Sequence, residues 1–113
     1  MSFDIKDYPT FLSEIKKRPQ MWCGGQERSA TLLSTFLNGF RYSEYFHKIP
    51  EPERLDGFDW EQFEKWVQKN HNPKGLSYDS FSWAVFQAKE ETKAFDLWFS
   101  WYEIYVQQLG DQL

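Results

Sequence analysis

The sequence predicts an all-α fold: a compact bundle of about five helices packed around a central C-terminal helix, in a single domain spanning residues 1–113. The stretch from about Glu90 to Leu109 is apolar around most of its circumference when it is read at helical spacing, so other helices have to surround it. Aromatic residues make up 20% of the chain, whereas valine and isoleucine are scarce. This composition favours helices packed through large flat side chains over a β-sandwich.

The final helix presents two apolar faces and one narrow polar face. Its length of about 30 Å would let it serve as a strut against which every earlier helix packs. The polar residues recur at i, i+4, i+7 and i+11, and we expect solvent to reach this line, the polar stripe, which is made of Asp96, Ser100, Glu103 and Gln107. The apolar faces are expected to hold Ala94, Leu97, Trp98, Trp101, Tyr105 and Leu109 on one side, and Phe95, Phe99, Tyr102 and Val106 on the other.

The first helix is expected over about Pro9 to Lys17, because apolar residues recur at helical spacing and a proline is tolerated in the first turn. The basic residues of its last turn complement the negative end of the helix dipole, and Pro19 then ends the helix. After it, residues 19–25 are typical of a loop that ends in a glycine pair. We expect Met21 and Trp22 of this loop to be buried between the first and the final helix.

A long helix follows, capped at its start by either Ser29 or Thr31 and ended before Pro50 and Pro52. Its apolar residues are Leu32, Leu33, Phe36, Leu37 and Phe40, followed by Tyr45 and Phe46. Farther along, residues 71–75 indicate a turn, and residues 76–87 satisfy both strand and helical spacing. We expect a helix in this second stretch, because a lone strand would have no partner.

The most uneven charge distribution lies in residues 51–64, the acidic segment, where six acidic residues are accompanied by a single basic one. The six acids are Glu51, Glu53, Asp56, Asp59, Glu61 and Glu64. Asp59 can cap a helix that runs to about Asn70. The buried stripe of that helix is expected to hold Trp60, Phe63, Trp66 and Val67, while Glu61, Glu64, Lys65 and Gln68 face out.

The composition argues against several classes of protein. A net charge of −4 disfavours binding to nucleic acid, which depends on phosphate contacts by lysine and arginine, and it suits a basic partner. The single cysteine excludes an intramolecular disulfide and fits a reducing cytosol. Met1 to Tyr8 lacks the apolar stretch of a signal peptide, and no run approaches the ~20 apolar residues that span a membrane. We therefore expect a cytoplasmic protein that binds neither nucleic acid nor membrane.

No group of residues indicates a particular reaction. Cys23 with His47 or His71 could form a nucleophile and its base, oriented by Asp79 or Asp96, but no nucleophile motif surrounds the cysteine. The two histidines and the cysteine lack the spacing of zinc ligands. The glycine pair lacks the remainder of a phosphate-binding motif. We expect no enzyme, no catalytic residues, no metal and no cofactor.

Four blocks of the sequence show a family resemblance in their order and spacing: KKRPQMW at 16–22, LSTFLNGF at 33–40, FEKWV at 63–67 and EETKAFDLWF at 90–99. They resemble the small bacterial immunity proteins of contact-dependent inhibition and polymorphic-toxin loci, whose pattern K-[KR]-P-x-M-[YW] the first block follows. The chain departs from the family at Trp22 and Cys23, where a tyrosine and an aliphatic residue are expected, and in its glycine pair. The resemblance implies an inhibitor of a cognate secreted toxin, often a nuclease.

The charge pattern of the acidic segment fits either a solvated surface that keeps the protein soluble or a surface for a partner. The resemblance favours a partner, because a nuclease needs a basic groove for its substrate and carboxylates can occupy such a groove. We therefore expect an antitoxin that neutralises a basic toxin domain through all six acids of the segment. The alternative is a non-catalytic interaction adaptor with another partner, and the polar stripe is the next candidate surface.

Overall fold

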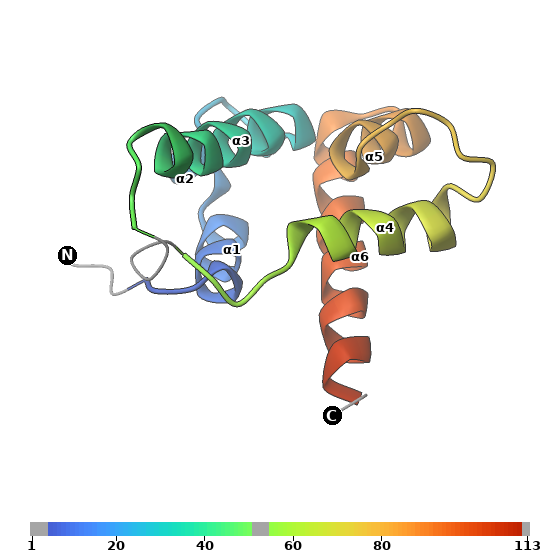
Figure 1. The fold of residues 1–113 in the computed structure, drawn as a ribbon. Helices are drawn as coiled ribbons and strands as arrows, with labels where there is room; N and C mark the ends of the chain where they lie inside the picture. The colour runs from blue at the N-terminus through green and yellow to red at the C-terminus, as the bar shows by residue number, and fades with distance from the viewer. Residues whose placement is uncertain (1–4, 51–54, 112–113) are drawn as a thin grey trace.

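The computed structural model describes residues 5–50 and 55–111, and these residues form six helices and no strand. The helices are α1 (Tyr8–Lys17), α2 (Pro19–Cys23), α3 (Ala30–Phe46), α4 (Trp60–His71), α5 (Ser80–Ala88) and α6 (Glu91–Asp111) (Figure 1). The predicted all-α bundle is confirmed, with six helices in place of about five. Residues 1–4 and 51–54, which include Glu51, Pro52 and Glu53, lie outside the described ranges.

Helix α6 supplies the largest set of buried residues in the core. The helices α3, α4 and α5 pack against it, and α5 makes the most extensive contact. Trp98 is fully buried, with its ring stacked on that of Phe81 at a centroid distance of 4.7 Å. The buried residues of α6 are Ala94, Phe95, Trp98, Phe99, Trp101, Tyr102 and Tyr105.

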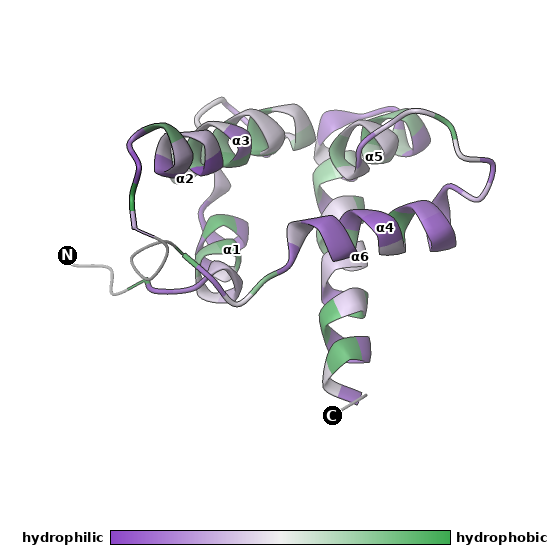
Figure 2. Ribbon diagram, viewed as in Figure 1, coloured by the Kyte–Doolittle hydropathy of each residue, from purple (hydrophilic) through white to green (hydrophobic). Residues whose placement is uncertain are grey.

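The C-terminal end of α6 extends past the helices that cover its first turns (Figure 1). Val106 and Leu109, which the periodicity places on the buried faces, are 38% and 43% exposed. Figure 2 shows hydrophobic residues continuing along this free end. The expectation that these two residues are buried is wrong, because α6 has 21 residues whereas α4 and α5 have 12 and 9.

The helix starts follow the local sequence. The N-caps of α1, α3, α4 and α5 are Asp7, Ser29, Asp59 and Asp79. Each of these side chains accepts a hydrogen bond from the backbone N–H three residues later. Thr31 is not a cap; its backbone N–H and hydroxyl donate to the Glu91 carboxylate at 3.1 and 2.9 Å. This contact ties the start of α3 to the start of α6.

The stretch after Pro19 is a short helix, α2, and not the predicted loop. Met21 is 54% exposed. Trp22 is half-buried, and its ring lies 5.3 Å from Phe11 of α1 and 6.4 Å from Phe36 of α3. The expectation that both residues are buried against the final helix is therefore wrong. Neighbouring side chains on a helix point about 100° apart, and here Trp22 is directed between α1 and α3 while Met21 points toward solvent.

The ambiguous residues 76–87 become helical from Ser80 onward, which confirms the helical prediction for most of the stretch. Phe81, Trp83 and Ala84 of α5 are buried. Lys89 then adopts a left-handed conformation with φ of 66° and ends the helix. Because only Lys89 and Glu90 separate the two helices, α5 and α6 are held close together.

Candidate partner-binding surface

The described acids of the acidic segment lie around the start of α4, and they have two different environments. Glu64 is half-buried. Glu61 is exposed, and its nearest cation is Lys65 on the same helix at 3.2 Å, an exposed pair that contributes little to stability. The acids whose side chains remain exposed are Asp56, Asp59 and Glu61. Whether Glu51 and Glu53 join them stays a prediction.

Two of the exposed acids also fix the backbone that leads into α4. The carbonyl oxygen of Asp56 accepts a hydrogen bond from the backbone N–H of Tyr8 at 2.8 Å, which holds this approach beside α1. The Asp59 carboxylate accepts the N–H of Gln62 at 3.0 Å as the helix cap. The Asp56 side chain takes no part in these contacts, so its charge stays at the surface.

Glu64 and Gln68 do not face out as the periodicity of α4 predicts. The Glu64 carboxylate accepts hydrogen bonds from the backbone N–H and the hydroxyl of Ser80, at 2.9 and 2.6 Å. The Ser80 hydroxyl oxygen in turn accepts the indole N–H of Trp98 at 2.8 Å, so one chain of hydrogen bonds joins α4, α5 and α6. Gln68 donates to the carbonyl of Tyr78 at 2.8 Å. Both predictions fail because periodicity within α4 carries no information about the connection that folds back onto it.

The Glu64 carboxyl gives folding a pH dependence of defined sign. Burial raises its pKa, although the hydrogen bonds from Ser80 act in the opposite direction. A carboxyl with a raised pKa binds its proton more tightly in the folded state, so its contribution to stability is lost as the pH rises from about 4 through that pKa. Glu64→Gln removes this titration. In urea titrations, we expect the unfolding free energy of the wild type, relative to Glu64→Gln, to decrease from pH ~4 to pH ~7. An increase over this range would mean that the Ser80 hydrogen bonds outweigh burial.

Three large aromatic side chains are exposed at the C-terminal end of α3. Tyr42, Tyr45 and Phe46, the aromatic cluster, are 62%, 70% and 73% exposed. The sequence pattern places Tyr45 and Phe46 among the apolar residues of this helix and does not predict that they form an exposed cluster. The helical phase holds the missing signal: Leu33 and Leu37 mark the buried face, and Phe46, nine residues after Leu37, points to the opposite side.

An open cavity of about 400 Å³ lies beside the aromatic cluster; it is lined by Tyr8, Asn38, Arg41, Tyr42, Glu44 and Tyr45. Glu44 links three segments at this cavity, because its carboxylate on α3 accepts the Tyr8 hydroxyl of α1 at 2.9 Å and the backbone N–H of Leu55 at 2.9 Å. Burial and the hydrogen bond to Glu44 raise the pKa of Tyr8, so the phenol stays protonated. Glu44 thereby holds the residues next to Asp56 close to the aromatic cluster.

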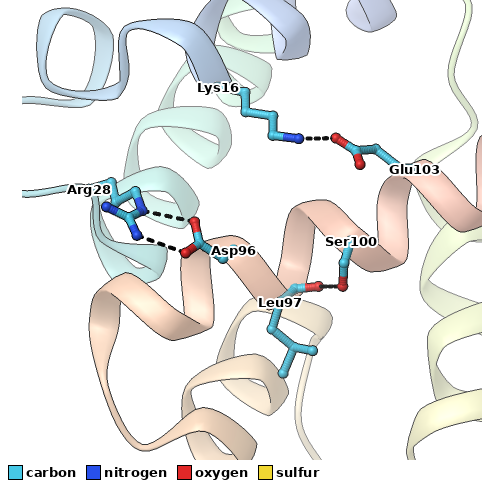
Figure 3. Close-up of polar contacts among 6 residues, drawn as sticks. All are labelled: Lys16, Arg28, Asp96, Leu97, Ser100 and Glu103. Atoms are coloured by element: carbon cyan, nitrogen blue, oxygen red, sulfur yellow. Dashed lines mark hydrogen bonds and ion pairs between the residues drawn. The ribbon is translucent and has the colours of Figure 1, made fainter.

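The polar stripe of α6 is engaged by the N-terminal part of the chain, as Figure 3 shows. The Asp96 carboxylate accepts two hydrogen bonds from the Arg28 guanidinium at 2.8 Å each, and this contact lowers the pKa of Asp96. Glu103 forms an ion pair with Lys16 of α1, and the Ser100 hydroxyl donates to a carbonyl of its own helix. The stripe therefore connects α1 and the residues before α3 to α6, which leaves less of it available to a partner.

Cys23 and His71, two of the residues considered for catalysis, are partly buried against other parts of the chain. Burial raises the pKa of the Cys23 thiol to about 11, so the thiol stays protonated near neutral pH and is a poor nucleophile. The His71 ring stacks on Trp101 at a centroid distance of 4.9 Å, and burial lowers its pKa. Within residues 5–50 and 55–111, no three side chains of His, Cys, Asp or Glu are grouped so that they could hold a metal ion. Over the same ranges, no helix combines the length and the apolar character needed to cross a membrane.

Two exposed features are thus available to a partner: the carboxylates at the start of α4 and the aromatic cluster of α3. Aromatic anchors beside charged residues are the usual composition of a protein-binding surface. Neither a known protein family, nor a curated protein, nor a solved structure shows significant similarity to this chain.

Proposed function

We propose that this chain is an immunity protein that acts in the cytoplasm, where it binds and neutralises the basic domain of a cognate toxin. A nuclease is the toxin class that the family resemblance implies. Three of the four blocks that carry the resemblance, at 33–40, 63–67 and 90–99, also supply core residues. Among these core residues are Leu37, Phe63 and Trp98.

The observation that carries the proposal is a difference between two sets of acids. Several carboxylates bind groups elsewhere in the chain, among them those of Glu44, Glu64, Glu91, Asp96 and Glu103. In contrast, Asp56 and Glu61 keep their carboxylates exposed, apart from the weak pair of Glu61 with Lys65. Their charge can therefore form charge-assisted hydrogen bonds with lysine and arginine in a substrate groove, which would block the toxin.

A non-catalytic adaptor is the second candidate function, and the aromatic cluster is the observation that favours it. Tyr42, Tyr45 and Phe46 carry no charge, so they give no preference for a basic partner. Exposed tyrosine and phenylalanine anchor many kinds of interface. A gene for a large toxin next to the gene for this chain would favour the immunity function over the adaptor function.

The direct test is co-expression with the toxin domain encoded beside the chain. We expect the chain to restore growth of cells that make the toxin and to be recovered with the toxin domain in a pull-down. A toxin from an unrelated locus serves as the control, because a cognate inhibitor should give no protection against it. If cells die although the chain is soluble and folded, and no complex forms, the immunity function is wrong and the adaptor function replaces it.

A further inference from the structure

One line of residues along α3 points directly away from the core. Thr35, Gly39, Tyr42 and Phe46 follow one another at spacings of four, three and four residues, so they share one face of the helix. All four are exposed. The buried residues Leu33 and Leu37 lie on the other side of the helix. We call this line the outer face of α3.

Gly39 has no function inside the folded chain that requires a glycine. It lies in the interior of a 17-residue helix, and it is not among the glycines with positive φ. A Cβ added there would meet no atom within 4 Å, so no neighbouring backbone or side chain requires the missing side chain. Glycine disfavours a helix interior relative to alanine. Its use on the outer face fits a notch into which a group from outside can enter.

The aromatic residues next to this notch are uncovered. Phe46 is 73% exposed, and its nearest rings are those of Tyr42 at 6.1 Å and Tyr45 at 6.2 Å, both on the same helix. The exposed Phe86 of α5 differs, because its ring stacks with those of Tyr78 and Trp83 at 5.3 Å each. Within residues 5–50 and 55–111, the outer face of α3 thus pairs an empty notch with large exposed side chains whose ring neighbours lie on α3 itself.

The charges on α3 identify the kind of molecule that fits this face. The helix carries only two charged residues, Arg41 and Glu44. Both are directed toward other parts of the chain: the Arg41 guanidinium lies 4.6 Å over the Trp60 ring, and Glu44 binds Tyr8 and Leu55. The outer face itself is uncharged. It would not attract a basic domain, and it is a place where two chains of net charge −4 can meet without opposing like charges.

We propose that the outer face of α3 is the contact through which two copies of this chain form a symmetric dimer. A two-fold axis between residues 42 and 43 of an antiparallel pair of α3 helices places Gly39 opposite the partner's Phe46, and Phe46 opposite the partner's Gly39. Each Phe46 ring then fills the notch at the partner's Gly39, so the same contact forms twice, as in any two-fold interface between identical surfaces. The dimer uses Tyr42 and Phe46 of the aromatic cluster, whereas the proposed toxin binding uses the carboxylates at the start of α4.

Sedimentation equilibrium of the full chain from micromolar to millimolar concentration tests the dimer. We expect the wild type to dimerise, and we expect Gly39→Gln to raise the dimer dissociation constant about tenfold or more, because its side chain fills the notch. Gln favours a helix over Gly, so the midpoint of urea unfolding of this variant should not fall at concentrations where the chain is monomeric. Weaker dimerisation would then not be a consequence of unfolding.

Two further variants and the salt dependence complete the test. Phe46→Ser should also weaken the dimer, whereas Phe86→Ser changes an aromatic residue of 52% exposure outside α3 and should leave the dimer intact. Added salt should not weaken the dimer, because the contact is uncharged and the chains repel. The proposal is overturned if the wild type stays monomeric throughout, or if Gly39→Gln dimerises as well as the wild type does. A monomer in which Gly39→Gln weakens toxin capture would assign this face to the toxin.

Discussion

The variant Trp98→Ala is expected to lose about 3–5 kcal/mol of unfolding free energy. Trp98 is fully buried, and its ring stacks on Phe81 at 4.7 Å and on Tyr102 at 5.9 Å. Alanine would leave a cavity where α4, α5 and α6 meet, and Ser80 would lose the indole N–H that donates to it. Small domains are stable by only about 5–15 kcal/mol, so this loss is a large share of the total.

Urea unfolding followed by far-ultraviolet circular dichroism measures this loss. Trp98→Phe is the matched variant: it keeps most of the ring but removes the hydrogen bond to Ser80, so its loss should be smaller. Trp66→Ala changes a half-buried tryptophan of α4 and should also lose less than Trp98→Ala. If Trp98→Ala lost less than about 1 kcal/mol, α6 would not be the centre of the core.

Charge reversal of Glu53, Asp56 and Glu61 is expected to slow association with a basic toxin domain by about tenfold or more at low salt. Favourable charges raise association rates, and salt screens exposed charges beyond roughly 10 Å at 0.1 M, so the difference from wild type should shrink as salt is added. Asp59 is left unchanged because its carboxylate caps α4, and replacing it would also test helix stability. Stopped-flow mixing at several salt concentrations measures the rate.

A second triple variant tests whether the association rate depends on where the acidic residues lie or only on the net charge. Reversing Glu27, Glu90 and Asp111 changes the net charge by the same amount at exposed positions outside the acidic segment. We expect a much smaller effect from it, and also from changes to the basic residues Lys16, Lys17 and Arg18. Equal slowing by both triple variants would show that net charge alone directs the encounter. If neither triple variant slows association, the binding site lies outside the acidic segment, and the immunity function is not contradicted by that result.

The fold could be predicted from the sequence because its helices depend on local rules. Asp7, Ser29, Asp59 and Asp79 each precede a run of apolar residues at helical spacing, and each caps the helix that follows. Amphipathic spacing and capping act within a few residues, so a single sequence contains the information. The buried stripe of α6 follows from the same rule up to Tyr105.

The incorrect predictions share a different cause, because the exposure of those residues depends on segments that are distant in the sequence. The periodicity of α4 cannot show that Ser80, 16 residues later, folds back to bind Glu64. The periodicity of α6 likewise cannot show that this helix extends beyond the helices around it, which leaves Val106 and Leu109 exposed. For the candidate site, the exposed acids Asp56 and Glu61 could be predicted, but the aromatic cluster follows from helical phase only once Leu33 and Leu37 are known to mark the buried face of α3.

The position of α6 in the chain has a consequence for the timing of folding during synthesis. Seven buried residues of the core belong to α6, and α6 follows every other helix. As the chain leaves the ribosome, α3 and α4 emerge before α6, against which both pack, so the parts of their apolar faces that α6 covers remain open to chaperones until α6 appears. The short connection to α5 gives α6 a nearby first partner, because closing a two-residue gap loses little entropy. Any activity that depends on the folded bundle therefore begins only once α6 has emerged.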